Sequence, residues 1–264
     1  MQVVKTPAGK FKGRCINLND VRGIYAGSAG VVCGAGPSLR FVDSRLYRHV
    51  VIAVNDAFSK LPKSPYYFSC DPSMVVHLHW CEVLASRCVV SVVLPEWRFK
   101  ENGKMAGVDK SRVLHIPLHE SMKMLPSDGK LVQGPSSAHV AAHLAYVMGC
   151  SPIYLVGCDC RCEDGKKYYW EFQNQPRGGM KDGAATYVLS EAKRCGKVQK
   201  KGHYDDWYKL DGTPTGDGMD GWRAMKQHNP GVNIIDASGR SGGAIAAAGI
   251  YPGVDVLDVM GRRK

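Results

Sequence analysis

The stretch that decides the fold class runs from residue 31 to residue 39 and reads VVCGAGPSL. A short apolar run that ends in glycines is typical of a buried strand followed by a tight turn into a helix. The turn lacks the third glycine of the GxGxxG fingerprint and the GK[ST] of the Walker P-loop. Its glycines let backbone N–H groups approach a phosphate, and a plain tight turn explains them equally well.

The same pattern recurs along the chain. Six further apolar runs, rich in β-branched residues, lie at residues 50–54, 66–70, 88–94, 113–116, 153–156 and 232–235. Runs of this length are typical of strands buried on both faces of a sheet. Residues 136–148 have helical spacing, and Gly149 follows as a stop signal. We therefore predict an α/β, three-layer, Rossmann-like fold with a mostly parallel sheet and helices on both faces.

Composition places the chain among globular proteins. The chain has 264 residues, of which 44% are hydrophobic and 22% charged. We expect a cytoplasmic protein with reduced cysteines, because no apolar run is long enough for a membrane span and the start lacks a signal core. The net charge of +11 is suited to a polyanionic partner such as DNA, although a charge that serves only solubility explains it too.

We expect three parts along the chain. An N-terminal arm covers residues 1–27, a single catalytic domain covers 28–250, and a basic tail covers 251–264. Residues 160–220 are rich in Gly, Lys, Tyr and Asp and break the strand–helix rhythm. A loop of that length in a compact domain is usually a lid or is disordered, so we predict a lid-like insertion over the site.

Polar residues follow several of the predicted strands. Asn55 and Asp56 follow the second, Asp71 follows the third, and Asp159 follows the sixth. Ligands of such folds bind beyond the carboxyl ends of the strands. The three carboxylates can hold Mg²⁺ bridged to a diphosphate, or they can cap the following helices. Asp71 is the better candidate for a functional acid.

Two stretches rich in cysteine and histidine suggest metal sites. Residues 158–162 read CDCRC and residues 77–81 read HLHWC, with ligand types at alternate positions. Structural zinc sites more often use CxxC pairs with partners elsewhere. Reduced cysteines beside a core strand are therefore the preferred reading, and no metal ligand is assigned.

The chain as a whole resembles the Rossmann-like superfamily with a GPSL motif, which includes bacterial sialyltransferases, motility accessory factors, archaeal pterin pyrophosphokinases and phage proteins of the DUF115 type. The resemblance spans roughly residues 28 to 245. The matching segments are GAGPSL (34–39), VIAVNDAF (51–58), YYFSCDPSM (66–74), GPSSAHVAAHLAYVMG (134–149), IYLVGCD (153–159) and NIIDASGRSGG (233–243).

The resemblance implies a nucleotide-activated donor bound across the strand ends. By analogy with the sialyltransferases, Tyr168 and Tyr169 stabilise the departing phosphate, and His203 is the general base by its order in the chain. Ordinary packing of the tyrosines and a solvated histidine are the competing readings. Binding of the nucleotide or donor is implied for Gly34, Gly36, Pro37, Ser38, Asn55, Ser136 and Ser137, beside Asp56 and Asp159 at the same strand ends.

The leading expectation is a glycosyltransferase that moves a sugar from a nucleotide-activated donor to an acceptor hydroxyl, with phage DNA or another anionic molecule as acceptor. Such transfer needs donors for the leaving phosphate, a base and exclusion of water. The alternatives are a Mg²⁺-dependent diphosphate transferase that resembles the pterin pyrophosphokinases, and a non-catalytic protein that binds nucleotide or nucleic acid. Mg²⁺ is implied only by the first of these alternatives.

Overall fold

The structure, a computed structural model, describes residues 15–70, 79–92, 108–119, 129–132, 135–161, 163–164, 166, 168–172, 216–240 and 243–261. Within these ranges the core is a seven-stranded sheet of order β5-β4-β3-β2-β1-β8-β9, in which every strand pair is parallel. Its strands are β1 (Gly30–Cys33), β2 (Val50–Val54), β3 (Tyr66–Ser69), β4 (Val89–Val92), β5 (Val113–His115), β8 (Ile153–Val156) and β9 (Ile234–Asp236).

The strands form where the apolar runs are, because a strand covered on both faces buries every side chain. All residues of β1, β2 and β3 are buried. Two further short strands, β6 (Leu118–His119) and β7 (Leu131–Val132), pair in a separate two-stranded sheet. The predicted three-layer α/β fold is confirmed.

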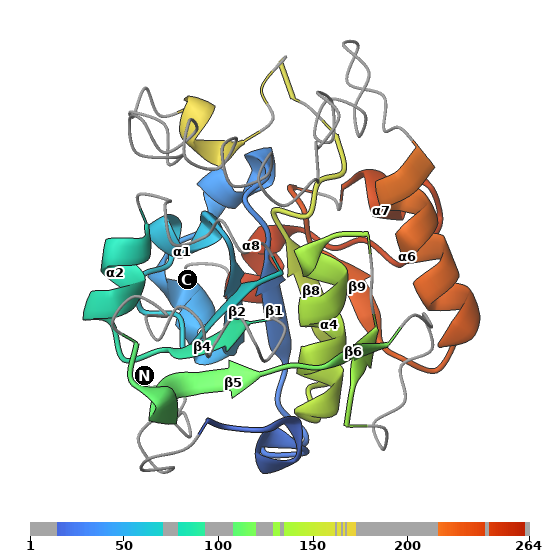
Figure 1. Cartoon of the computed structure of the whole chain (residues 1–264). Helices are drawn as coiled ribbons and strands as arrows, with labels where there is room; N and C mark the ends of the chain where they lie inside the picture. The colour runs from blue at the N-terminus through green and yellow to red at the C-terminus, as the bar shows by residue number, and fades with distance from the viewer. Residues whose placement is uncertain are drawn as a thin grey trace, which may run out of the picture.

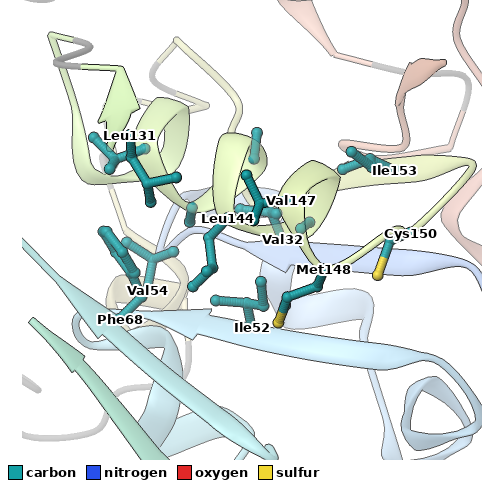
Figure 2. Packing of buried hydrophobic residues seen from close by; sticks show 14 of the residues in the cluster. Val32, Ile52, Val54, Phe68, Leu131, Leu144, Val147, Met148, Cys150 and Ile153 are labelled. Carbon is teal, nitrogen blue, oxygen red and sulfur yellow. The ribbon is translucent and has the colours of Figure 1, made fainter. Parts of the chain in front are cut away.

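One face of the sheet is covered by α4 (Ser137–Val147), which Figure 1 shows in front of the sheet alongside β1 and β8. Leu144 and Val147 of α4 pack on Val32, Ile52 and Phe68 in one apolar cluster, as Figure 2 shows. The longer helix α6 (Gly216–His228) and the short α7 (Ala244–Ala247) add buried residues to the same cluster. Gly149 ends α4 with φ +86°, as its sequence position predicts.

The opposite face carries shorter elements and a second apolar cluster. This cluster joins strand residues to buried residues of helices α1 (Ala57–Lys60), α2 (Trp80–Ala85) and α8 (Val256–Met260), and of 3₁₀ segments η2 (Pro37–Phe41), η3 (Ser44–Arg48) and η6 (Tyr169–Phe172). Two more 3₁₀ segments are η1 (Leu18–Val21) and η5 (Lys110–Arg112).

Residues at both ends of the described chain belong to the core. The Ile16 N–H donates to the Val113 carbonyl, and Ile16, Leu18 and Val21 are buried. Near the other end α8 is buried against η3. The described parts of the segments expected as an arm and a tail therefore both contribute to the packing, because their apolar residues are buried against elements that are distant in sequence. No helix in the described ranges is long and apolar enough to cross a membrane.

Strand order also locates the crevice of the fold. The chain builds β1 to β5 outward on one side and then returns to place β8 and β9 on the other side of β1. Because β1 and β8 are neighbouring parallel strands, the loops that follow them leave the sheet side by side (Figure 1). In open α/β sheets this reversal of strand order is where ligands bind.

Candidate functional site

The loops after β1 and β8 are tied directly to each other. The Gly36 N–H donates to the Gly157 carbonyl over 2.9 Å, and the Gly157 N–H donates to Ser38 Oγ over 3.1 Å. The Ser38 N–H in turn donates to Asp159 Oδ2 over 3.1 Å. A Cβ on Gly36 would lie 2.3 Å from Asp159 Oδ2, and one on Gly34 would lie 2.5 Å from the Gly157 carbonyl oxygen. These glycines are required because the two loops touch.

The electrostatics of Asp159 follow from this contact. Burial raises the pKa of its carboxyl to about 6, against the opposing effect of the hydrogen bonds from Ser38. Because Asp159 is buried and holds Ser38, its position suits bracing of the two loops. Pro37 starts η2 directly after the turn and is buried with Ser38. The predicted residues of this turn thus lie together at the reversal of strand order.

Asn55 follows β2 and shows two unusual features. Its backbone has φ +51°, in the left-handed region that few non-glycine residues adopt. Its side-chain Oδ1 is buried, and no described residue provides it with a hydrogen bond. Cys160, on the other side of β1, also has a positive φ of +49°. Strained backbone and unsatisfied polar atoms both concentrate at functional sites.

Asp56 is held from two directions. Its Oδ1 lies 2.8 Å from Nδ1 of His79, whose Nε2 lies 3.0 Å from the Tyr67 hydroxyl. The Tyr169 hydroxyl donates to the Asp56 carbonyl over 3.3 Å, and the Tyr169 N–H donates to the Ala35 carbonyl over 3.1 Å. Tyr169 therefore links the loops after β1 and β2, and burial raises the pKa of its hydroxyl.

His79 is the residue that the sequence does not single out as a partner of Asp56. The two are 23 positions apart, and the only local signal is the HLHWC stretch, which suggests metal ligation instead. In the described ranges no group of three or more His, Cys, Asp or Glu side chains is arranged to hold a metal ion.

The N-terminal end of α4 reaches the end of β3. Ser137 Oγ accepts a hydrogen bond of 3.1 Å from the Cys70 N–H. The Ser136 hydroxyl shares a hydrogen bond of 2.7 Å with His139 Nδ1, and the His139 ring stacks on Trp222 of α6 at 3.8 Å. Ser136 makes no side-chain cap to the helix. The positive end of the helix dipole therefore lies beside the residue that follows β3, where it favours an anion.

Aromatic and charged side chains of η2, of η6 and of the residues before η6 contact one another. Tyr168 and Trp170 stack face to face at 4.4 Å. The Arg40 guanidinium lies 4.1 Å from the Phe172 ring centre and forms an ion pair with Glu163. Tyr168 is thus stacked on a neighbouring ring.

Two predicted site residues, Asp71 and His203, lie outside the described residues. Most of the expected insertion over residues 160–220 also lies outside them. The predicted residues within the described ranges come from the loops after β1, β2 and β8, from the start of α4 and from η6. The three loops directly follow strands of the seven-stranded sheet at its carboxyl edge.

Comparison with known families gives one match. The family model described as 6-hydroxymethylpterin diphosphokinase MptE-like matches residues 11–165, which is more than half of the chain. This family falls within the broad grouping that the sequence resembles, and the match carries nothing specific to sialyltransferases. No curated protein and no solved structure matched.

Proposed function

Since the chain belongs to the MptE-like family, we propose that it is a diphosphokinase, which moves a diphosphate group from ATP to a hydroxyl group. The acceptor is the hydroxymethyl group of a pterin, as the description of the family suggests. The acceptor oxygen attacks the β-phosphorus, the bond from that phosphorus to the bridging oxygen of the α-phosphate breaks, and AMP leaves. The hydroxyl proton passes to a base or to water.

The observation that best supports a nucleotide site at the carboxyl edge of the sheet is the buried Oδ1 of Asn55, which lacks a hydrogen-bond partner among the described residues. An amide oxygen only accepts hydrogen bonds or binds cations, so its partner is a donor such as a ribose hydroxyl or a base amino group. A ligand that donates a hydrogen bond to this oxygen would remove the free-energy cost of an unsatisfied buried acceptor. The phosphates then extend toward the start of α4, where Ser136, Ser137 and the helix dipole favour negative charge.

The residues present fit a magnesium ion that arrives with ATP. Mg²⁺ is commonly held by one or two carboxylates together with substrate phosphates. Asp56 is suited to be such a ligand, because 12% of its side chain is exposed at the carboxyl edge of β2. Asp159 fits less well, since it is buried and bound to Ser38. When bound, Mg²⁺ would neutralise charge on the phosphates.

The remaining predicted residues enter the proposal with separate roles. Tyr169 positions the Asp56 backbone, and the loop glycines Gly34 and Gly36 allow the two loops to meet. Asp71 stays a candidate metal ligand, while Tyr168 and His203 stay candidates for contacts with the transferred group. Glycosyl transfer from a nucleotide sugar, to DNA or another anionic acceptor, stays a prediction that the same experiment tests.

The experiment is calorimetric titration of the whole chain with ATP, CMP and UDP, each with and without Mg²⁺. Diphosphate transfer predicts ATP binding that Mg²⁺ strengthens and that Asn55→Ala weakens. Metal-independent preference for CMP or UDP would overturn the proposal in favour of the glycosyltransferase. No binding of any nucleotide would contradict both, and DNA binding with a steep salt dependence would then identify a nucleic-acid-binding protein.

A further inference from the structure

Three side chains, those of Tyr67, His79 and Asp56, form a continuous hydrogen-bonded series. Asp56 Oδ1 lies 2.8 Å from His79 Nδ1, and His79 Nε2 lies 3.0 Å from the hydroxyl of Tyr67. Tyr67 is fully buried on β3, the His79 side chain is 0% exposed, and the Asp56 side chain is 12% exposed. The series therefore runs from Tyr67 in the core to the carboxylate of Asp56, which alone among these three side chains is partly exposed to solvent.

The chemistry of the imidazole gives this series a direction. To bond an ionised Asp56, Nδ1 of His79 must carry a hydrogen and donate it. Nε2 of the neutral ring then accepts from the Tyr67 hydroxyl. Both ring nitrogens are engaged, so a rotation of the ring would break two buried hydrogen bonds. Pairing of one ring nitrogen in this way selects the hydrogen position on the other.

Packing holds the tyrosine that ends the series. The Tyr67 ring lies edge-on to Phe58 at 5.7 Å and to Trp80 at 6.0 Å between ring centres. His79 itself precedes α2 directly, and its own ring lies 5.5 Å from that of Tyr67. The imidazole is thus held between β3, which carries Tyr67, and the start of α2.

A purely local role for Asp56 does not fit these contacts. Asp56 precedes α1, where an aspartate commonly caps the helix by accepting from its first N–H groups. The Asp56 side chain makes no such cap bond. Its carboxylate is turned to His79, while its carbonyl accepts from Tyr169. The carboxylate is therefore oriented by distant residues and not by the helix that it precedes.

We infer that His79 is a positioning residue, which fixes the Asp56 carboxylate for contact with the phosphates and magnesium of the nucleotide, and that Tyr67 fixes the ring of His79. The identity of the ligand at Asp56 rests on the proposed function, whereas the orienting series rests on the contacts described above. Outer partners of this kind typically change metal affinity or activity by about 10- to 100-fold when they are removed.

Four variants of the full chain test this inference. His79→Leu removes both hydrogen bonds, whereas His79→Asn keeps an amide N–H near the place of Nδ1. Tyr67→Phe removes only the hydroxyl. Tyr66→Phe is the matched control, since Tyr66 is the adjacent fully buried tyrosine of β3, and its hydroxyl pairs with Tyr25 at 3.0 Å in the apolar cluster of the other face.

The main readout is the Mg²⁺ concentration that half-saturates ATP binding, measured by calorimetry, beside the affinity for ATP without metal. We expect His79→Leu to raise this concentration by about 10- to 100-fold and Tyr67→Phe by about 10-fold. His79→Asn should recover part of the loss, and Tyr66→Phe should not change it. ATP affinity without metal should be similar in all four. An unchanged Mg²⁺ requirement in His79→Leu and Tyr67→Phe, with lowered stability, would overturn the inference.

A second measurement separates failure of the inference from failure of the proposed function. Nitrogen NMR of the imidazole, recorded without nucleotide, reports which ring nitrogen of His79 carries hydrogen. The inference predicts hydrogen on Nδ1 in the wild type and also in Tyr67→Phe, because Asp56 still accepts from Nδ1 in that variant. Hydrogen on Nε2 alone in the wild type would overturn the series itself. A wild type with this NMR signature that binds no ATP with Mg²⁺ would instead remove the proposed function.

Discussion

Replacement of Asn55 by glycine separates a functional role of this residue from a structural one. Glycine adopts φ +51° without steric cost, whereas a non-glycine residue pays about 1 kcal/mol there. The substitution also removes the buried Oδ1, whose lack of a partner among the described residues costs about 1 to 3 kcal/mol. The greater freedom of glycine in the unfolded chain opposes these gains by about 0.4 to 1 kcal/mol.

These contributions predict that Asn55→Gly is more stable than the wild type by about 1 to 3 kcal/mol. Asn55→Ala keeps the left-handed backbone, so it should be less stable than the glycine variant by about 1 kcal/mol. Both should bind ATP with Mg²⁺ about 5- to 30-fold more weakly, because one hydrogen bond of about 1 to 2 kcal/mol is lost.

Urea denaturation gives the stabilities, and calorimetric titration gives the affinities. Asp164→Gly is the matched control, because Asp164 also has φ +51° but lies exposed in another loop, and its change should leave ATP affinity unaltered. A glycine variant at position 55 that loses more than about 1 kcal/mol of stability and binds ATP as the wild type does would refute the reasoning. Asn55 would then be a structural residue.

Three further predictions concern the braced loops. Gly36→Ala places a Cβ 2.3 Å from Asp159 Oδ2 and should lower the free energy of unfolding by about 1 to 3 kcal/mol in urea denaturation; an unchanged midpoint would show that the loops do not touch. The pKa of Asp159 is raised from 3.8 to about 6, so the folded state binds the proton more tightly and this group lowers stability as pH rises from about 4 to 6. Asp159→Asn should therefore gain about 2 kcal/mol relative to the wild type between pH 4 and pH 7, and parallel pH profiles of the two proteins would contradict this. Tyr169→Phe leaves the Asp56 carbonyl without that donor and should cost about 1 kcal/mol of stability, measured in the same way, with no loss if the 3.3 Å contact is incidental.

The sheet could be predicted from the sequence because its strands are buried on both faces. Such strands must be apolar at every position, and runs such as residues 50–54 therefore stand out from their polar flanks. The carboxyl-edge residues could be located for the same reason, since Asn55 directly follows one of these runs and Asp159 lies in the turn after another. The order of the strands follows from no single run, and it is the order that places the loops after β1 and β8 side by side.

Contacts between distant residues could not be predicted from their local sequence. Ser38 and Asp159 are 121 positions apart, and neither has a neighbour that indicates the other. The glycines at 34 and 36 suggest a phosphate turn, whereas the structure shows a further requirement, which is contact with the loop at Gly157. Ile16 looks like part of a peripheral segment because its hydrogen-bonding partner, Val113, lies nearly a hundred positions away.

The most direct test of the central claim is a product assay. The full chain is incubated with ATP, Mg²⁺ and 6-hydroxymethylpterin, and the phosphorus-containing products are identified by phosphorus NMR and mass spectrometry. Diphosphate transfer predicts equal amounts of AMP and of a pterin that carries two additional phosphate groups, with both products lost in the absence of Mg²⁺. Absence of AMP and of any modified pterin, in a preparation that is folded, would contradict the claim.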